Sequence, residues 1–187
     1  MEHVDANILT MIFLQIPHRM HEIANAHIVL KKIMMMDDTC RFVLEREWKD
    51  ICIDAIKLDE LKYLKYLTKT TVSISSDMIL CAAHVGNLRC LKYLCKHEKI
   101  MTDNLRLRVI RATTLSENPA CFEYTYVLYG RYDTDNATRN YVIDSGSVEC
   151  AKKAVELGVP SIRSIDSMCI AASNGALDII KYLHGIG

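Results

Sequence analysis

The feature that most constrains this chain is a close internal repeat. Residues 80–94 read L-C-A-A-H-V-G-N-L-R-C-L-K-Y-L, and residues 169–183 read C-I-A-A-S-N-G-A-L-D-I-I-K-Y-L. The two segments share an Ala-Ala pair, a glycine, a leucine and a Lys-Tyr-Leu triplet in register, at an offset of 89 residues. This offset is about three times a period of roughly 30 residues, which is typical of solenoid proteins. The chain is therefore expected to be a stack of repeated units.

Weaker copies fill the interval and extend it toward the N-terminus. Residues 140–154 match at an offset of 60, with Gly146 at the glycine position. Residues 53–67 match at an offset of 27 and repeat the Lys-Tyr-Leu triplet, with Asp59 where the glycine stands. Residues 105–128 fit only if a short insertion is allowed. The sequence thus predicts about five units of unequal quality.

Each unit has the pattern of two short antiparallel helices. In the first helix, Ile79, Ala82 and Ala83 recur at helical spacing, and the small alanines let neighbouring helices approach closely. Gly86 and Gly175 can take positive φ where that helix ends. The second helix carries a wide apolar stripe, made of Leu88, Leu91, Tyr93 and Leu94 in one unit and Leu177, Ile180, Tyr182 and Leu183 in another. Because one unit cannot bury this stripe alone, the units are expected to stack.

An aspartate stands just before the first helix in three of the units, at Asp50, Asp77 and Asp166. A side-chain oxygen at the N-cap accepts a hydrogen bond from the exposed amides of the first helical turn. We therefore expect each of these aspartates to cap its helix and to mark where the helix begins.

The repeated pattern, clearest at residues 82–88 and 171–177, resembles the ankyrin repeat. The resemblance covers residues 49–187 and is closest to the short, Lys-Tyr-Leu-rich repeats abundant in large DNA viruses and some protists. This chain lacks the family's T-P-L-H opening, and its period is shorter than the usual 33 residues. The resemblance implies an all-α helix-pair solenoid of about five degenerate repeats that binds a target protein. For a viral protein it implies action in the cytoplasm or nucleocytoplasm of the host cell.

Residues 1–48 do not fit the repeat. Their spaced apolar pairs and the later segment Val29–Ile33 resemble an F-box, which implies a small helical segment that engages a Skp1-type protein. The residues that would make this contact are Ile8, Leu9, Ile12, Phe13, Ile16 and Pro17. In that case the chain is a substrate adaptor of a Skp1-cullin type ubiquitin ligase. The alternative is an N-terminal cap over the first repeat, since solenoid ends hide their apolar faces, and then the chain is a plain ankyrin scaffold or competitor.

Charge and composition favour a protein partner. The chain has 23 Lys+Arg and 23 Asp+Glu, which argues against nucleic acid as the partner. Its longest apolar runs are too short to span a bilayer and its start does not resemble a signal peptide, so a cytoplasmic location is expected. The candidate interface lies in the irregular middle repeat, where arginines and tyrosines gather. Its residues are Arg106, Arg108, Arg111, Tyr124 and Tyr126. The lysines at 57, 62, 65 and 69 alternate with Asp54, Asp59 and Glu60, which predicts a solvated, ion-paired helix face.

Chemical motifs give little support for an enzyme, a metal site or a cofactor site. The eight cysteines show no paired C-x-x-C spacing. Cys90 and Cys150 share one repeat position and Cys169 falls on that of Leu80, so we interpret the cysteines as small core residues. No nucleophile elbow and no glycine-rich phosphate loop is present. We therefore expect no catalytic, metal or cofactor residues.

Overall fold

The structure is a computed structural model that describes residues 49–70, 73–98, 101–116, 118–130, 133 and 136–186. The chain divides into two units, Met1–Glu47 and Trp48–Gly187. The described residues all lie in the second unit. Its described residues are helical or lie in the segments between helices, and none of them is in a strand. The prediction of an all-α fold is therefore confirmed for this part of the chain.

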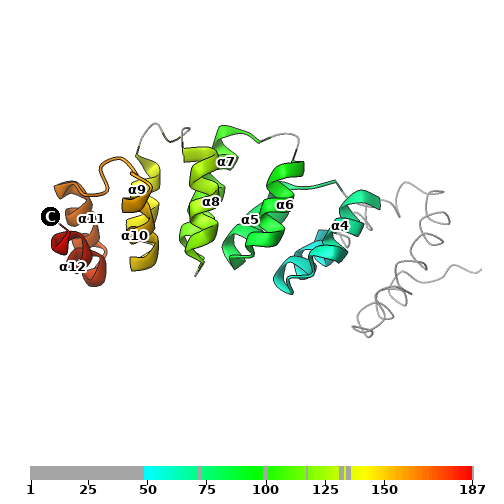
Figure 1. Cartoon of the computed structure of the whole chain (residues 1–187), viewed down its shortest axis with the longest axis horizontal. Helices are drawn as coiled ribbons and strands as arrows, with labels where there is room; N and C mark the ends of the chain where they lie inside the picture. The colour runs from blue at the N-terminus through cyan, green and yellow to red at the C-terminus, as the bar shows by residue number, and fades with distance from the viewer. Residues whose placement is uncertain are drawn as a thin grey trace, which may run out of the picture. The chain divides into compact units, whose positions relative to one another are not determined.

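The helices follow one another in pairs (Figure 1). A helical stretch at 49–57 precedes α4 (Leu61–Thr70). Four complete pairs follow: α5 (Ser76–Val85) with α6 (Leu88–His97), α7 (Asp103–Thr114) with α8 (Pro119–Tyr129), α9 (Ala137–Asp144) with α10 (Val148–Glu156), and α11 (Ile165–Ser173) with α12 (Leu177–Gly185). In each complete pair the two helices contact each other. The pairs coincide with the units that the sequence repeat predicts.

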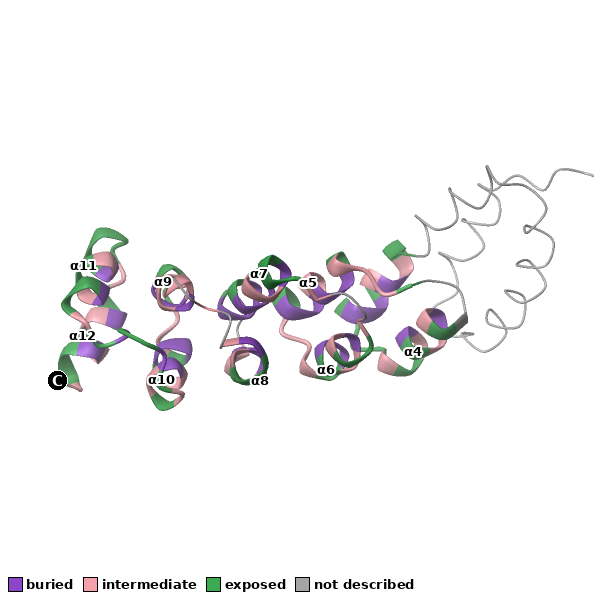
Figure 2. Ribbon diagram, turned by 90° about the horizontal axis from the view of Figure 1, so that it is seen from above, coloured by how far each residue is buried: buried purple, intermediate pink, exposed green. Residues whose placement is uncertain are grey.

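Successive pairs pack side by side in two layers. In the first layer α5 contacts α7, α7 contacts α9 and α9 contacts α11; in the second, α4, α6, α8, α10 and α12 form the equivalent series of neighbours. Figure 2 shows the two rows of helices, with buried residues concentrated where the rows face each other. Each pair thus contributes one helix to each layer and shares its core with the pairs on either side.

Repeat positions that the pattern assigns to the core are buried where a unit has neighbours on both sides. Ala82, Ala83, Cys90 and Cys150 are buried. Cys169, in contrast, is exposed, so the prediction that it is a core residue is wrong. Among the described helices, α11 has a first-layer neighbour on one side only, in α9. The equivalent residue of an inner unit, Leu80, is itself only half-buried, so this repeat position lies at the edge of the core and is exposed in α11.

The predicted aspartate caps are also wrong. Asp77 and Asp166 are the second residues of α5 and α11, and Asp50 lies within the helical stretch 49–57. The N-cap of α11 is Ser164, whose side chain accepts a hydrogen bond from the amide of Ser167. Serine caps as well as aspartate does, so the helix begins at the earlier of two suitable residues. In the first turn, an aspartate still interacts favourably with the positive end of the helix dipole.

The turn between the two helices takes positive φ at the two glycines for which it was predicted. Gly86 and Gly175 have φ of 77° and 69°. In the first unit, which lacks the glycine, Asp59 occupies the same repeat position and also has positive φ, at 56°. The first unit therefore keeps this turn without a glycine, whereas no described residue between α7 and α8 has positive φ.

Candidate functional site

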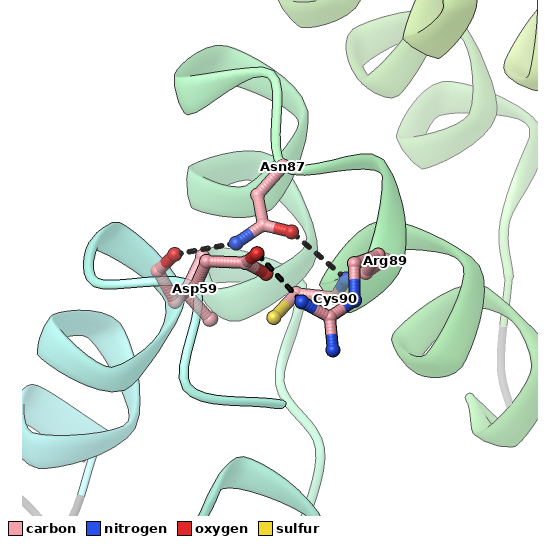
Figure 3. Close-up of polar contacts among 5 residues, drawn as sticks. Asp59, Asn87, Arg89 and Cys90 are labelled. Atoms are coloured by element: carbon pink, nitrogen blue, oxygen red, sulfur yellow. Dashed lines mark hydrogen bonds and ion pairs between the residues drawn. The ribbon is translucent and has the colours of Figure 1, made fainter. Parts of the chain in front are cut away.

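Each boundary between neighbouring pairs is held by polar contacts, and Asn87 makes the clearest of them (Figure 3). Asn87 is the N-cap of α6, and its side-chain oxygen accepts from the amide of Cys90 at 3.1 Å. Its amide nitrogen donates to the carbonyl of Ile56 in the preceding unit at 2.8 Å. Beside it, Arg89 Nη1 lies 2.8 Å from a carboxylate oxygen of Asp59. One asparagine thus caps its own helix and binds the unit before it.

The same hydrogen-bond arrangement is found at the next boundary. Asn118 caps α8 through the amide of Ala120 at 3.1 Å, and its side-chain nitrogen donates to the carbonyl of Gly86 at 2.9 Å. Ser147 holds the equivalent place before α10 and accepts from the amide of Cys150 at 3.2 Å. Because the side chain of serine is shorter than that of asparagine, Ser147 caps its helix but does not bind the preceding unit. This boundary is joined instead by the Thr114 hydroxyl, which donates to the carbonyl of Tyr141 at 3.3 Å.

Sequence reasoning did not identify these asparagines, although a signal was present. Asn87 directly follows Gly86, at the start of an apolar helix pattern, and asparagine is among the preferred N-cap residues. Its second contact, to Ile56, joins residues 31 positions apart. No local pattern indicates such a partner, because the partner is set by how the units stack.

The arginines predicted for an interface all lie in α7, in the first layer. Arg108 and Arg111 are exposed, and Arg106 is half-buried and forms an ion pair with Asp103. The guanidinium of Arg111 lies 5.6 Å from the centre of the Tyr141 ring in α9, a cation–π contact with the next unit.

The two tyrosines predicted for the same interface lie in α8, in the second layer, and both are half-buried. The ammonium of Lys92, from α6, lies 5.4 Å from the centre of the Tyr124 ring. The Tyr126 ring packs against Phe122, with 5.8 Å between the ring centres. The arginines and tyrosines are therefore divided between the two layers, and their contact with a partner stays a prediction.

The lysine-rich face at residues 57–69 differs from the predicted ion-paired face. Lys57 does lie 3.5 Å from a carboxylate oxygen of Asp54, but Asp59 binds Arg89 of the next unit. In the described part of the chain, Lys62, Lys65 and Lys69 form no ion pair. The ammonium of Lys65 instead lies 5.5 Å from the centre of the Tyr93 ring in α6. The Tyr93 hydroxyl is held in turn by Thr68, at 2.7 Å.

The described cysteines are free thiols, and most of them are buried or half-buried. Burial raises the pKa of Cys52 from 9.0 to about 12, and it raises the pKa of Cys90, Cys95 and Cys121 to about 11. A thiol with so high a pKa stays protonated near neutral pH, and only the thiolate is a good nucleophile or metal ligand. Within the described ranges, no three His, Cys, Asp or Glu side chains are placed to hold a metal ion.

Residues 1–48, with the predicted Skp1-type contact residues Ile8, Leu9, Ile12, Phe13, Ile16 and Pro17, lie outside the described part of the structure. Among the helices that are described, none is long and apolar enough to cross a membrane. Comparison with protein-family models, with curated proteins and with solved structures finds no match to this chain. Its function is therefore inferred from the sequence pattern and from the geometry of the helix pairs.

Proposed function

We propose that residues 49–187 form a protein-recognition module built from about five divergent ankyrin-type repeats. The observation that carries this proposal is the regular packing of helix pairs, in which each pair places one helix in each of two layers. Stacked units of this kind present a long surface made of equivalent positions from successive repeats, and such surfaces bind proteins. The polar contacts of Asn87 and Asn118 support the same interpretation, because they hold neighbouring units together.

The N-terminal segment, residues 1–48, completes the proposed role. Its F-box-like sequence would engage a Skp1-type protein, so that a target held by the repeats is presented to a ubiquitin ligase in the cytoplasm. The chain would then act as an adaptor that binds two proteins at once. This role needs neither catalysis nor a cofactor.

A pull-down with an immobilised Skp1-type protein tests the adaptor role. We expect the full chain to be retained, and the double variant Ile12→Asp plus Phe13→Ala to be lost. Leu177→Asp is the matched control, because Leu177 is a large exposed apolar side chain of the last helix pair, with 58% of its surface accessible. This variant should be retained as the parent is. Failure of the parent to bind, with its helices intact by circular dichroism, would remove the adaptor role.

The alternative is a plain scaffold or competitor in which residues 1–48 only cap the first repeat. The exposure of Ala172 in α11 favours it, because the equivalent Ala83 is fully buried in a unit that has neighbours on both sides. The same double variant separates the two roles through stability. For a cap, Ile12→Asp plus Phe13→Ala should lower the thermal unfolding midpoint of the repeats; for a docking segment, the midpoint should change little.

A further inference from the structure

The outer face of α4 and α6 carries a cluster of basic residues. The sequence of α4 is LKYLKYLTKT and that of α6 is LRCLKYLCKH, and neither helix contains an acidic residue. Lys62, Lys65 and Lys69 occupy positions i, i+3 and i+7 of α4 and are exposed. Residues three and four apart lie on the same side of a helix, so these lysines form one stripe, about 10 Å long at 1.5 Å per residue.

The same three repeat positions are basic in the next unit. Arg89, Lys92 and Lys96 follow the α4 stripe at the offset of 27 residues, and they too are exposed. Since α4 and α6 are neighbours in the second layer, the two stripes lie side by side. We call the six residues of the two stripes the basic face.

Other units neutralise these positions, which shows that a basic stripe is not a requirement of the fold. In α10, the residue equivalent to Arg89 is Glu149, and it lies 2.7 Å from Lys152. In α12, the equivalent residue is Asp178, and it lies 3.3 Å from Lys181. Lys152 and Lys181 hold the repeat position of Lys65 and Lys92. The lysine is therefore present in all four helices, whereas the residue three positions before it is acidic in α10 and α12 and basic in α4 and α6.

The acidic residues nearest to the basic face are few, and Glu123 of the neighbouring α8 lies 3.5 Å from Lys153 of α10. Asp59 binds Arg89, Glu60 precedes α4 and Glu98 follows α6. In the described part of the chain, Lys62, Lys65, Lys69, Lys92 and Lys96 take part in no ion pair. Excess positive charge is thus concentrated on two adjacent helices of a chain whose net charge is zero.

Two of these lysines are already positioned by aromatic rings. Lys65 lies over the ring of Tyr93, and Lys92 lies over the ring of Tyr124, with 5.5 Å and 5.4 Å from ammonium to ring centre. An ammonium group has three donors, and a ring occupies only one side of it, so donors are left for a partner. Binding then costs less side-chain entropy than it does for a free lysine.

We propose that the basic face of α4 and α6 binds an acidic segment of the target protein, rich in Asp or Glu. This rests on the proposed function, since it names the chemistry of the protein that the repeats recognise. The negative carboxylates of such a segment complement the positive charge of the two neighbouring stripes. Single-stranded nucleic acid fits less well, because its bases need open aromatic faces for stacking, and Tyr93 and Tyr124 already have lysines over their rings.

Fluorescence anisotropy on the full chain tests this, with a labelled dodecapeptide of alternating glutamate and serine as the probe and its glutamine counterpart as control. We expect saturable binding of the glutamate peptide, weakened by added salt because exposed charges are screened. Lys65→Glu plus Lys92→Glu should weaken it by about tenfold or more. Lys152→Glu plus Lys181→Glu changes the net charge equally at equivalent repeat positions and should weaken it by less than about twofold, since charges beyond about 10 Å are screened.

Three results would overturn the proposal: no saturable binding of the glutamate peptide, equal losses in the two double variants, or tighter binding of a single-stranded oligonucleotide that Lys65→Glu plus Lys92→Glu abolishes. The Skp1 pull-down distinguishes this failure from failure of the adaptor role. If the chain binds the Skp1-type protein but not the peptide, only the proposal for the basic face is rejected. If the chain binds the peptide but not the Skp1-type protein, only the adaptor role is rejected.

Discussion

At the scale of single residues, Gly86 is subject to two separate constraints. Its φ is 77°, a conformation that costs other L-residues about 1–2 kcal/mol. A Cβ at this position would also lie 3.0 Å from Cβ of Asn118 and 3.4 Å from Cβ of Ser116, both in the following unit. Gly175 shares the positive φ but has open space around it. The two glycines therefore separate the cost of conformation from the cost of close packing.

We predict that Gly86→Ala destabilises the chain by about 2 kcal/mol or more, and Gly175→Ala by about 1 kcal/mol. The difference reflects the displacement that a Cβ at residue 86 forces on Asn118. Urea unfolding followed by circular dichroism measures both. Equal losses would show that the contact between units at Gly86 can relax at no cost.

Because of its buried thiols, the folded chain should lose free energy of unfolding as the pH rises into the alkaline range. The pKa of Cys52 is raised from 9.0 to about 12 by burial, so the folded state favours the neutral thiol. Its stabilising contribution is complete below pH 9.0 and is lost as pH rises toward the folded-state pKa, at up to about 1.4 kcal/mol per pH unit. We predict that Cys52→Ala makes the fall in unfolding free energy between about pH 9 and pH 11 shallower. Cys169→Ala, at an exposed site, is the control and should leave that slope unchanged.

At the scale of helices, the boundaries between units depend on residues that both cap a helix and reach the preceding unit. Asn87→Ser keeps an oxygen for the amide of Cys90 but removes the donor to Ile56, and it reproduces the arrangement at Ser147. We predict a loss of about 1 kcal/mol for Asn87→Ser and about 2 kcal/mol for Asn87→Ala. Ser147→Ala, which removes a cap only, should cost about 1 kcal/mol. Thermal and urea unfolding check all three, and an Asn87→Ser variant as stable as the parent would contradict the second role of Asn87.

Much of this level was predictable from the sequence. The helix pairs, the buried alanines at Ala82 and Ala83 and the positive φ at Gly86 all follow from local pattern, because each depends on a few neighbouring residues. The sequence misled where the outcome depends on a neighbouring unit. Cys169 falls on the repeat position of Leu80, which is half-buried, yet Cys169 is exposed. Asp59 lies next to lysines in the sequence, yet it binds Arg89, 30 residues along the chain.

At the scale of the whole described stack, charge and stability are both distributed unit by unit. The zero net charge of the chain combines a basic face on α4 and α6 with neutralised stripes on α10 and α12. The buried apolar side chains form one cluster that runs from Cys52 to Leu183, but within it each helix contacts mainly its partner and the equivalent helices of adjacent pairs. Stability should then be close to a sum of contributions from individual units and from the contacts between neighbours.

Deletion of residues 164–187, which removes α11 and α12, tests this most directly when it is followed by hydrogen exchange and mass spectrometry. We predict that amides in α5 to α8 stay protected, because these helices make their contacts with units that remain. Exchange should become faster in α9 and α10, which lose a neighbour. Loss of protection throughout α5 to α8 would contradict a stack of locally stabilised helix pairs and would show that the described units fold only as a whole.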